Sequence, residues 1–574
     1  MILLSAQPDT NYFLWQLEVQ LKNFASFGIR KDSIHILFGY DPCTDINPNC
    51  LQFIEEHIDL ACFFVYPDTR ISKHYISSIR PNIIKQHFNQ FPDLSAECIF
   101  YNDSDIVFTN KLPDFDRMCS GDTWYLSDAR GYLNSAYINS FGDNILDDMC
   151  QVMQIDKEMV LKNDHHAGGA QYLMKNLSFS FWDDVERDSE KLFEHLIRNK
   201  NRYSLEFEKK TGRPHSEYKE IQAWCSDMWA LLWNGFRSYD IKIDQELNFC
   251  WPKYDITEWD KNMIFHNAGI SHFERDLHFY KSDYKEVDPY SSFLGFVSSA
   301  TCGYKYIKMV EDVGRQKKYT ISNATFILFL RADGEETINI LKSTLFFLKQ
   351  NFQTNIMVAE IGNFQKIIKE DLPDSIIYTF IESHEDDIRA GENLNEIIRH
   401  VKTDIIINYE PGVILPPDQI YKGVTALRYN RCAVNYPFST NLLLVPEPFR
   451  SFFIKNNDIR FLVKHVQKFI PIPNTLFRGC NIVFKEKFLE IEGFNNVVND
   501  PATLGQLFDK KIRLLRVQSR REAGLVFLLK DISGNLKHPL SYQKAIVDHQ
   551  EFLRMANLSR EEYIVDPLEE ISLF

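Results

Sequence analysis

Short apolar runs alternate with stretches of helical spacing along the first part of the chain. Residues 1–7, 33–40 and 62–66 are apolar runs of strand length, and residues 11–24 place apolar side chains at helical spacing. Continuous apolar runs are typical of strands in a parallel sheet that is covered by helices on both faces. The pattern therefore predicts an α/β fold with a largely parallel sheet.

The same alternation starts again in the second half of the chain. Residues 324–330, 355–362 and 375–381 have the pattern of buried strands, and residues 335–352 that of an amphipathic helix. A strand–helix–strand series that restarts from its beginning indicates a second complete domain of related architecture. Residues 286–322 lack strong periodicity, so we expect a linker and supporting segment there.

The length of the chain also indicates more than one domain. At 574 residues it exceeds what one hydrophobic core usually supports. The final residues look mostly helical and charged. The predicted organisation is a first domain, a linker, a second domain and a helical C-terminal extension, over residues 1–285, 286–322, 323–520 and 521–574.

The composition is that of a folded chain and argues against one class of partner. The sequence is 44% hydrophobic and 14% aromatic, which is typical of a globular protein rather than a disordered one. A formal net charge of −15 argues against a general nucleic-acid binder, but it permits a local cationic pocket for a phosphate. We therefore expect no nucleic-acid partner.

The sequence predicts neither a secretion signal nor a membrane span. The opening apolar run is too short for a signal peptide, and no stretch approaches the roughly 20 apolar residues of a spanning helix. Eleven cysteines are scattered without a metal-ligand spacing, so we interpret them as reduced core thiols. We expect a cytoplasmic protein, and peripheral contact with a membrane surface stays open.

Two carboxylates one residue apart follow a predicted strand. Asp103 and Asp105 flank Ser104 in the apolar sequence CIFYNDSDIVF. Side chains at i and i+2 of an extended segment point the same way, so this pair can hold one hard divalent cation and leave positions for phosphate oxygens. A polar turn after a strand is the plainer interpretation. In α/β sheets, however, ligands bind beyond the carboxyl ends of the strands, which is where this pair lies.

Two further segments carry polar residues in apolar surroundings. Gly168-Gly169 would let the backbone approach a ligand closely, and Gln171 offers both a donor and an acceptor; a plain turn before a helix is the alternative. Asp227 lies on or next to the apolar face of a predicted helix over residues 221–236. A carboxylate there needs either a structural partner or an active-site role.

A histidine and a lysine complete the set. The apolar strand MIFHNAGI contains His266 at its end, with Gly269 three residues later and Lys281 beyond. Imidazole can complete a metal site begun by two carboxylates, and a lysine can neutralise a leaving phosphate. These residues together suit a metal that holds a diphosphate leaving group, with further polar groups to position a sugar and its acceptor.

The motifs resemble those of the GT-A glycosyltransferases, which use a nucleotide-sugar donor and a Mn²⁺ or Mg²⁺ ion. Over residues 1–285 the chain is similar to the retaining enzymes of the glycogenin and bacterial lipooligosaccharide galactosyltransferase kind. Its opening SAQPDTNYFLWQ also resembles the peptidyl-serine galactosyltransferase and hydroxyproline arabinosyltransferase group. The resemblance implies a GT-A fold, a nucleotide-sugar donor, of which a UDP-sugar is the default, and a glycan or other hydroxyl acceptor.

The same resemblance implies the metal ligands. Asp103 and Asp105 match the metal-binding Asp-x-Asp of the family. His266 and Gly269 match its C-terminal His-x-x-Gly, in which the histidine is the third protein ligand. Lys281 matches the lysine on the donor diphosphate, although the family's Lys-Pro-Trp is absent here.

The resemblance also implies residues around the sugar and the nucleotide. Asp227 aligns with the aspartate of an Asp-Gln-x-x-Leu-Asn helix near the sugar, although Met228 replaces the glutamine. We interpret Asp227 and Gln171 as the catalytic candidates. Gln7 and Asp9 fall where the base and ribose are held, and Arg80 where a basic residue contacts the donor. The donor-binding set is therefore Gln7, Asp9, Arg80, Ser104, Gly168, Gly169, Gly269 and Lys281. The implied reaction retains the anomeric configuration, by front-face attack or a short-lived ion pair.

Residues 324–520 resemble a second GT-A domain, of the inverting family that includes chondroitin-type polymerases and galactosyltransferases. Arg331 and Asp333 fit its base-binding strand end. The Asp-x-Asp is replaced by Asn-Tyr-Glu-Pro-Gly from Asn408, so that only Glu410 and Asp500 remain as candidate carboxylates. One carboxylate is a poor Mg²⁺ site, and an inverting enzyme needs a base. The interpretation is a catalytically silent domain, with a metal-independent transferase as the alternative.

Three functions remain open from the sequence. The first is a metal-dependent glycosyltransferase, by analogy in bacterial surface polysaccharide or glycoconjugate synthesis. The second is a non-catalytic carbohydrate-binding protein built from decayed transferase domains. The third is a nucleotidyltransferase, which usually opens with a Gly-rich basic loop that SAQPDTNY lacks.

Overall fold

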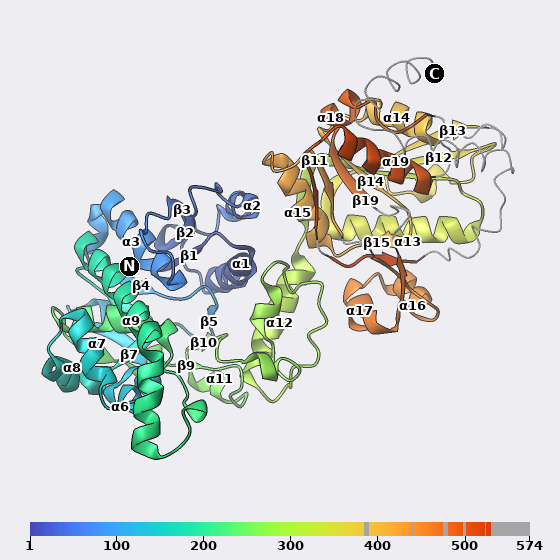
Figure 1. Cartoon of the computed structure of the whole chain (residues 1–574). Coiled ribbons are helices and arrows are strands. Elements are labelled where there is room, and N and C mark those ends of the chain that lie inside the picture. Colours follow the sequence, from blue (N-terminus) through green and yellow to red (C-terminus); the bar gives the residue numbers. More distant parts are fainter. Residues whose placement is uncertain (384–389, 439–440, 474–479, 497–500, 523, 530–574) are drawn as a thin grey trace. The chain divides into compact units, whose positions relative to one another are not determined.

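The structure is a computed structural model of the whole chain (Figure 1). It describes residues 1–574 except 384–389, 439–440, 474–479, 497–500, 523 and 530–574. The chain divides into two compact units. The first comprises Met1–Pro289 and Leu294–Val313, and the second comprises Tyr290–Phe293 and the chain from Gly314 onward.

The first unit contains a seven-stranded sheet of order β3-β2-β1-β4-β7-β6-β8. Strands β3, β2, β1 and β4 are parallel, whereas β7 runs antiparallel to β4 and to β6, and β8 is parallel to β6. The strands are Ile2–Pro8 (β1), Ile34–Tyr40 (β2), Cys62–Pro67 (β3), Ile99–Tyr101 (β4), Trp124–Asp128 (β6), Gly168–Met174 (β7) and Ile241–Ile243 (β8). The α/β fold with parallel strands that the alternating pattern predicted is confirmed.

A small second sheet, of order β5-β10-β9, joins three distant parts of this unit. It consists of Ile106–Phe108 (β5), Phe249–Cys250 (β9) and Ile264–His266 (β10). β10 is antiparallel to β5 and parallel to β9. This pairing brings the end of β10 to the beginning of β5, directly after the two aspartates.

Helices pack on the sheet of the first unit. The longest, α9, packs against α3 and α10. It begins after Ser178, whose hydroxyl accepts the backbone N–H of Phe181, and it ends at Gly212, which adopts a positive φ of 66°. The helices are Asn11–Ser26 (α1), Pro48–His57 (α2), Ile79–Gln90 (α3), Phe115–Cys119 (α4), Arg130–Leu133 (α5), Ser135–Asn139 (α6), Ile145–Met153 (α7), Lys157–Asn163 (α8), Phe179–Thr211 (α9), Ser226–Phe236 (α10) and Glu258–Lys261 (α11).

Large aromatic side chains fill the core beneath α10. Trp124, Trp182, Trp229 and Trp233 are each at most 1% exposed and belong to one apolar cluster. Aromatic side chains bury large areas, so they contribute strongly to the stability of such a core. The beginning of α10, which carries Asp227, therefore rests on a closely packed support.

The second unit repeats the strand order of the first. Its seven-stranded sheet has the order β13-β12-β11-β14-β19-β16-β20 and the same pattern of parallel and antiparallel neighbours. The strands are Tyr319–Leu330 (β11), Phe352–Gly362 (β12), Ile376–Glu382 (β13), Ile405–Tyr409 (β14), Val434–Tyr436 (β16), Cys480–Phe484 (β19) and Ser519–Arg521 (β20). Each unit therefore has a mixed α/β sheet with four adjacent parallel strands.

A four-stranded sheet and seven helices complete the described part of this unit. The sheet has the order β15-β21-β17-β18 and consists of Val413–Ile414 (β15), Asn441–Leu444 (β17), Ile470–Pro473 (β18) and Phe527–Leu528 (β21). The helices are Glu335–Asn351 (α13), Ala390–His400 (α14), Pro417–Arg428 (α15), Phe449–Asn456 (α16), Ile459–Lys464 (α17), Lys485–Glu490 (α18) and Pro501–Leu514 (α19). The predicted helical extension over 521–574 is wrong for residues 521–522 and 524–529, which contain the end of β20 at Arg521, and β21, but no helix. Residues 530–574 lie outside the described residues.

The segment predicted as a linker, residues 286–322, contains a regular helix. α12 (Cys302–Gln316) buries Tyr306, Ile307 and Val310 along one side. The buried positions have helical spacing, but three of them are occupied by cysteine, glycine and tyrosine, so the apolar pattern is weak in the sequence. The predicted domain limits stay a prediction, and β11 already begins at Tyr319.

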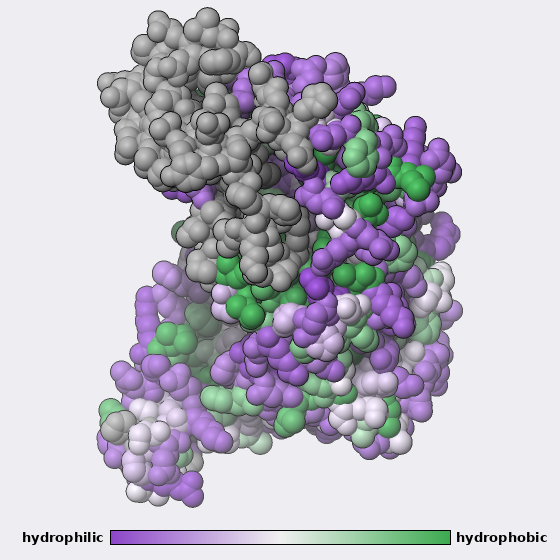
Figure 2. Space-filling model, turned by 90° about the vertical axis from the view of Figure 1, so that its right-hand side faces the viewer, coloured by the Kyte–Doolittle hydropathy of each residue, from purple (hydrophilic) through white to green (hydrophobic). Residues whose placement is uncertain are grey.

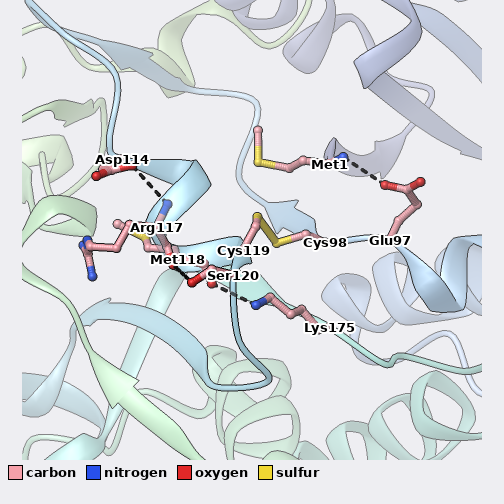
Figure 3. The surroundings of a disulfide bond; sticks show 9 residues. All are labelled: Met1, Glu97, Cys98, Asp114, Arg117, Met118, Cys119, Ser120 and Lys175. Carbon is pink, nitrogen blue, oxygen red and sulfur yellow. Dashed lines mark hydrogen bonds and ion pairs between the residues drawn. A yellow bond between two sulfur atoms is a disulfide. The ribbon is translucent and has the colours of Figure 1, made fainter.

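One pair of cysteines corrects the prediction that all of them are reduced. Cys98 and Cys119 form a disulfide with a Cα–Cα distance of 6.0 Å (Figure 3). Cys98 directly precedes β4 and Cys119 is the last residue of α4, so the folded chain brings together two positions whose spacing carries no signal. Nearby, the Lys175 ammonium donates to the Met118 carbonyl at 2.9 Å. The other nine cysteines are free thiols.

Among the described residues, no helix combines the length and the apolar composition required to cross a membrane. On the face of the molecule shown in Figure 2, hydrophilic residues predominate and hydrophobic residues are scattered among them.

Candidate functional site

Asp103 and Asp105 lie in the short connection between β4 and β5. The backbone of this connection is held by Gln20 of α1, whose amide nitrogen donates to the Asp103 carbonyl at 2.7 Å and to the Ile106 carbonyl at 3.3 Å. The Asp103 side chain is 26% exposed, whereas that of Asp105 is 4% exposed. The Asp103 carboxylate is therefore partly exposed to solvent, whereas the Asp105 carboxylate is buried.

His266 reaches both aspartates because β10 pairs with β5. His266 lies opposite Ile106 in this antiparallel pair, and the backbone N–H of Asn267 donates to the Asp105 carbonyl at 3.0 Å. The His266 Nε2 atom is 3.2 Å from Asp105 Oδ1 and 3.5 Å from Asp103 Oδ2. The predicted convergence of these three side chains is present in the structure.

These three residues have the right donor atoms for a divalent metal ion. One ligand atom from each of Asp103, Asp105 and His266 can be chosen so that all lie within 4.8 Å of one another. Two hard oxygens and one imidazole nitrogen suit Mn²⁺ or Mg²⁺ with positions left for other ligands. His266 Nδ1 is buried and has no hydrogen-bond partner among the described residues. The donor set therefore fits the predicted ion.

Trp251 and Gly269 fix the position of the histidine. The Trp251 ring stacks on the His266 ring with centroids 5.7 Å apart and planes at 15°. Gly269 has a φ of +76°, and a Cβ there would lie 3.0 Å from the Trp251 ring. A larger residue at this position would strain the backbone and displace the tryptophan ring that stacks on the histidine. The glycine thus serves the packing behind His266.

Two cationic side chains neutralise the two carboxylates. Lys281 contacts Asp105 Oδ2, and Arg80 at the beginning of α3 donates to Asp103 Oδ1 at 2.8 Å. Burial acts to raise the pKa of Asp105, but Lys281 and His266 outweigh it, so that this pKa is lowered. The Asp105 carboxylate is therefore ionised over the physiological pH range, as a metal ligand must be.

Asp227 is connected to the same cluster through Arg80. Its Oδ2 atom is 3.9 Å from Arg80 Nη1, and its Oδ1 atom is 2.7 Å from the hydroxyl of Tyr75. The same hydroxyl lies 2.6 Å from the Trp224 carbonyl and accepts the backbone N–H of Asp227 at 2.9 Å. Burial raises the pKa of Asp227, and Arg80 opposes that shift. A buried carboxylate that is held in place and tuned in this way can bind or exchange a proton at the site.

Gly168 and Gly169 do not form the turn that we considered. They begin strand β7, and a Cβ on Gly168 would lie 2.8 Å from the Ser127 carbonyl oxygen. A Cβ on Gly169 would lie 2.7 Å from the Met228 side chain. Close packing inside the protein explains both glycines, whereas contact with a donor stays a prediction.

Gln171 is fully buried in β7. Its carbonyl oxygen accepts the Ser127 hydroxyl at 3.2 Å, and its amide nitrogen has no hydrogen-bond partner among the described residues. An unpartnered buried amide is costly unless something polar reaches it. The catalytic role predicted for Gln171 stays a prediction.

The other predicted donor-binding residues are engaged in the fold. Gln7 donates to the Leu37 carbonyl at 2.8 Å and is 1% exposed, so its amide ties β1 to β2. Asp9 accepts the backbone N–H of Asn47 at 2.7 Å, before α2. Ser104 is 5% exposed between the two aspartates. Their roles toward a nucleotide stay predictions.

Three residues of the site were not singled out from the sequence. Gln20 holds the backbone around Asp103, Tyr75 binds Asp227, and Trp251 stacks on His266. Gln20 carries a usable signal, because a buried glutamine on the apolar face of α1 needs polar partners. Tyr75 and Trp251 carry none, since each reaches the site only through the tertiary fold.

The second unit has different residues at the corresponding place. Asn408, near the end of β14, donates to Asn481 Oδ1 at 2.8 Å, and Glu410 follows β14 before β15. Arg331 and Asp333 form an ion pair of 2.9 Å after β11. Asp500 lies outside the described residues. Among the residues that the structure describes, Asp103, Asp105 and His266 form the one group suited to a metal ion.

Comparisons with known proteins give limited similarity. No protein-family model and no curated protein matches the chain. Among solved structures, it is similar to the mannosyltransferase PcManGT from Pyrobaculum calidifontis, solved with GDP-Man and Mn²⁺, at 14% identity and a TM-score of 0.23 over 37% of this chain and 58% of that one. It is also similar to S. aureus TarS 1-349, at 10% identity and a TM-score of 0.25 over 36% and 60%. The complex of TarS with UDP-GlcNAc gives 9% identity and a TM-score of 0.29 over 42% and 68%.

The chain thus spans about three fifths of the length of the first two structures. At these TM-scores the matches carry no argument about fold or activity. The α/β architecture rests on the strand order of the two sheets, and the site rests on its side chains.

Proposed function

We propose that this chain is a metal-dependent glycosyltransferase that moves a sugar from a nucleotide-sugar, by default a UDP-sugar, to the hydroxyl of a glycan or other acceptor. The observation that carries this proposal is the meeting of Asp103, Asp105 and His266 beside Lys281. Three ligands for a divalent ion next to a lysine form a site suited to a diphosphate. The site follows β4, one of the parallel strands, where α/β sheets bind ligands.

Each side chain has a role in this proposal. Asp103, Asp105 and His266 would hold Mn²⁺ or Mg²⁺, which when bound supplies charge stabilisation for the departing diphosphate. Lys281 would turn from Asp105 to the diphosphate and add a second positive charge. Arg80 keeps Asp227 next to the cluster, and Asp227 would stabilise positive charge on the sugar or orient the acceptor.

The reaction breaks the bond between the anomeric carbon and the diphosphate oxygen, which leaves with the electron pair. The acceptor oxygen forms the new bond, and its proton passes to the departing diphosphate oxygen. Retention of configuration, by front-face attack or a short-lived ion pair, is part of the proposal. The domain would contribute mainly by holding the acceptor hydroxyl close to the anomeric carbon.

The second unit is proposed to be catalytically silent. The connection after β14 carries Glu410 in place of an aspartate pair, and one carboxylate holds Mg²⁺ poorly. A metal-independent second transferase remains the alternative, since Asp500 lies outside the described residues. Two tandem GT-A domains, a role in bacterial surface polysaccharide synthesis and a cytoplasmic location belong to the same proposal, by analogy.

A nucleotide-release assay tests the proposed activity. The purified chain would be mixed with UDP-, GDP- and CMP-sugars, with Mn²⁺ or with EDTA, beside the Asp105→Ala variant. We expect release from one donor that is lost with EDTA and in the variant. Release that persists in both would contradict the metal site. Absence of release together with no metal-dependent thermal stabilisation by UDP would favour a non-catalytic carbohydrate-binding protein.

A further inference from the structure

A buried arginine closes the loop between β3 and α3. Arg70 comes shortly after β3, and its side chain is 5% exposed. Its Nη1 atom donates to the Tyr75 carbonyl at 2.6 Å, to the Ile76 carbonyl at 3.2 Å and to the Ser78 hydroxyl at 2.9 Å. Residues 71–74, between these ends, lie outside helices and strands. One guanidinium nitrogen therefore joins the beginning of the loop to its end.

The sheet holds the other side of this guanidinium. Asp68 directly follows β3, and its backbone N–H donates to the carbonyl of Tyr40, the last residue of β2, at 2.7 Å. The Arg70 Nε and Nη2 atoms donate to the two Asp68 carboxylate oxygens, each at 2.9 Å. Such a bidentate pair fixes the plane of a guanidinium and the direction in which its remaining nitrogen points. The end of the sheet therefore determines where Arg70 Nη1 lies.

A second pair of the same kind in this unit lacks the third contact. Asp128 and Arg130 have the same spacing, and the Arg130 Nε and Nη2 atoms donate to the two Asp128 oxygens at 3.0 and 2.6 Å. The Arg130 side chain is 49% exposed, and its Nη1 atom makes no hydrogen bond to a described residue. An aspartate and an arginine at this spacing are thus satisfied without Nη1. The three Nη1 bonds of Arg70 therefore serve the loop that it closes.

That loop supplies the side chain that holds Asp227. The Tyr75 hydroxyl lies 2.7 Å from Asp227 Oδ1 and accepts the Asp227 backbone N–H at 2.9 Å. The Tyr75 ring stacks on Phe193 of α9 with centroids 4.6 Å apart. Phe193 thus supports the ring of Tyr75, whereas Arg70 holds its backbone carbonyl. Both supports are needed to place the hydroxyl, because a ring contact alone leaves the backbone of an irregular loop unfixed.

We infer that Arg70 is a positioning residue for Asp227. It fixes the backbone of Tyr75, and Tyr75 in turn fixes the Asp227 carboxylate. This inference rests on the proposed function, in which Asp227 acts on the sugar or the acceptor. The hydrogen bonds of Arg70 reach neither the metal ligands nor Asp227 itself. Arg70 should therefore affect the rate of transfer and not the binding of metal and nucleotide.

Arg70→Lys tests the inference. Lysine keeps the positive charge beside Asp68, but its single nitrogen cannot bind both this carboxylate and the loop in the original geometry. A misplacement of about 1 Å can cost about 100-fold in rate, so we expect nucleotide release to slow about 10- to 100-fold. Calorimetric titration should give unchanged affinities for Mn²⁺ and for UDP with Mn²⁺. Arg130→Lys is the matched control and should leave release and binding unchanged.

Two outcomes of these assays would overturn the inference. The first is unchanged release from Arg70→Lys. The second is a loss of release in proportion to a loss of UDP binding, which would indicate a merely structural role. Thermal unfolding checks that each variant is folded. If Arg70→Lys does not fold, the double substitution of Arg70→Met with Asp68→Leu replaces it, because removal of both charges leaves no buried charge uncompensated.

A second measurement requires no activity. Arg70 and Asp227 are connected through Tyr75, so Arg70→Lys and Asp227→Asn should not act independently on the free energy of unfolding. In denaturation experiments the double variant should lose less stability than the sum of the two single losses, whereas Arg130→Lys with Asp227→Asn should be additive. Additive losses for the Arg70 pair would overturn the inference. If the unmodified chain releases nucleotide from no donor, the proposed function fails, and this coupling alone decides whether Arg70 positions Asp227.

Discussion

Lys281 is predicted to compete with a bound metal ion for Asp105. Its ammonium contacts Asp105 Oδ2, and the Asp105 side chain is 4% exposed, so a divalent ion on that oxygen requires the lysine to leave. A charge-assisted hydrogen bond contributes roughly 1.5–3 kcal/mol. At about 1.4 kcal/mol for each tenfold change, this corresponds to about 10- to 150-fold in affinity. We therefore expect Lys281→Met to bind Mn²⁺ alone about 10- to 150-fold more tightly than the unmodified chain.

The Lys281→Met substitution should have the opposite effect on the affinity for the nucleotide. Without the lysine, the diphosphate loses one cation, so Lys281→Met should bind UDP with Mn²⁺ more weakly and release less nucleotide from a donor. Calorimetric titration of Mn²⁺, with and without UDP, measures both effects. Lys285→Met is the matched control, because Lys285 is exposed and close in sequence.

Stability gives a second measurement on the same variant. In the absence of metal, Lys281→Met leaves the buried Asp105 carboxylate without its closest cation, so the melting temperature should fall. The rise in melting temperature on adding Mn²⁺ should be larger for this variant than for the unmodified chain. Equal or weaker binding of Mn²⁺ alone to a folded Lys281→Met chain would refute the competition.

Three further predictions concern the first unit. Burial lowers the pKa of His35 to about 4 and that of His87 to about 3, so both side chains favour the neutral form in the folded state. Their contribution to the free energy of unfolding is complete above about pH 6.5 and is lost as the pH falls toward 4. The free energy of unfolding should be about 2 kcal/mol lower per histidine at pH 5 than at pH 7. In denaturation experiments the His87→Gln variant should show a smaller pH dependence of this free energy than the unmodified chain, and an unchanged dependence would contradict the prediction. Tyr75→Phe should destabilise the chain by about 1–3 kcal/mol and slow nucleotide release, because the Asp227 backbone N–H loses its acceptor and the Asp227 carboxylate keeps only the Met228 N–H as a hydrogen-bond partner. Denaturation and release assays check both effects, and a variant with neither effect would exclude this role. Cys119→Ser should lower the free energy of unfolding by about 3 kcal/mol, since the disulfide closes a loop of 21 residues. If reduction leaves the intact mass of the unmodified chain unchanged, the disulfide is absent.

The pattern of apolar runs was sufficient to predict three of the four adjacent parallel strands in each seven-stranded sheet. Residues 1–7, 33–40 and 62–66 correspond to β1, β2 and β3, because buried strands need apolar side chains on both faces and so leave a plain signal. α12 left a weaker signal, since cysteine, glycine and tyrosine take three of its buried positions and only Ile307, Val310 and Val313 are aliphatic.

Residue type and position after a strand were enough to find the cluster around Asp105 and His266, because carboxylates and imidazole at strand ends have few structural roles. The same reasoning could not distinguish the roles of Gly168, because a glycine that permits close packing within the protein, a glycine that forms a turn and a glycine that lets a ligand approach look alike in the sequence. The disulfide was missed because a spacing of 21 residues does not indicate that two cysteines meet. These features depend on neighbours supplied by distant parts of the chain.

The antiparallel pairing of β5 with β10 has a consequence for how the site comes into being. Lys281 and Asp105 are 176 residues apart in the sequence, and His266 reaches the aspartates only when β10 has paired with β5. Contacts between such distant residues form late in folding because a long loop must close first. A chain that has been synthesised only as far as α9 would carry the two aspartates without their histidine or lysine. Tight binding of a metal ion would therefore begin only when β10 has paired with β5 and the first unit has folded.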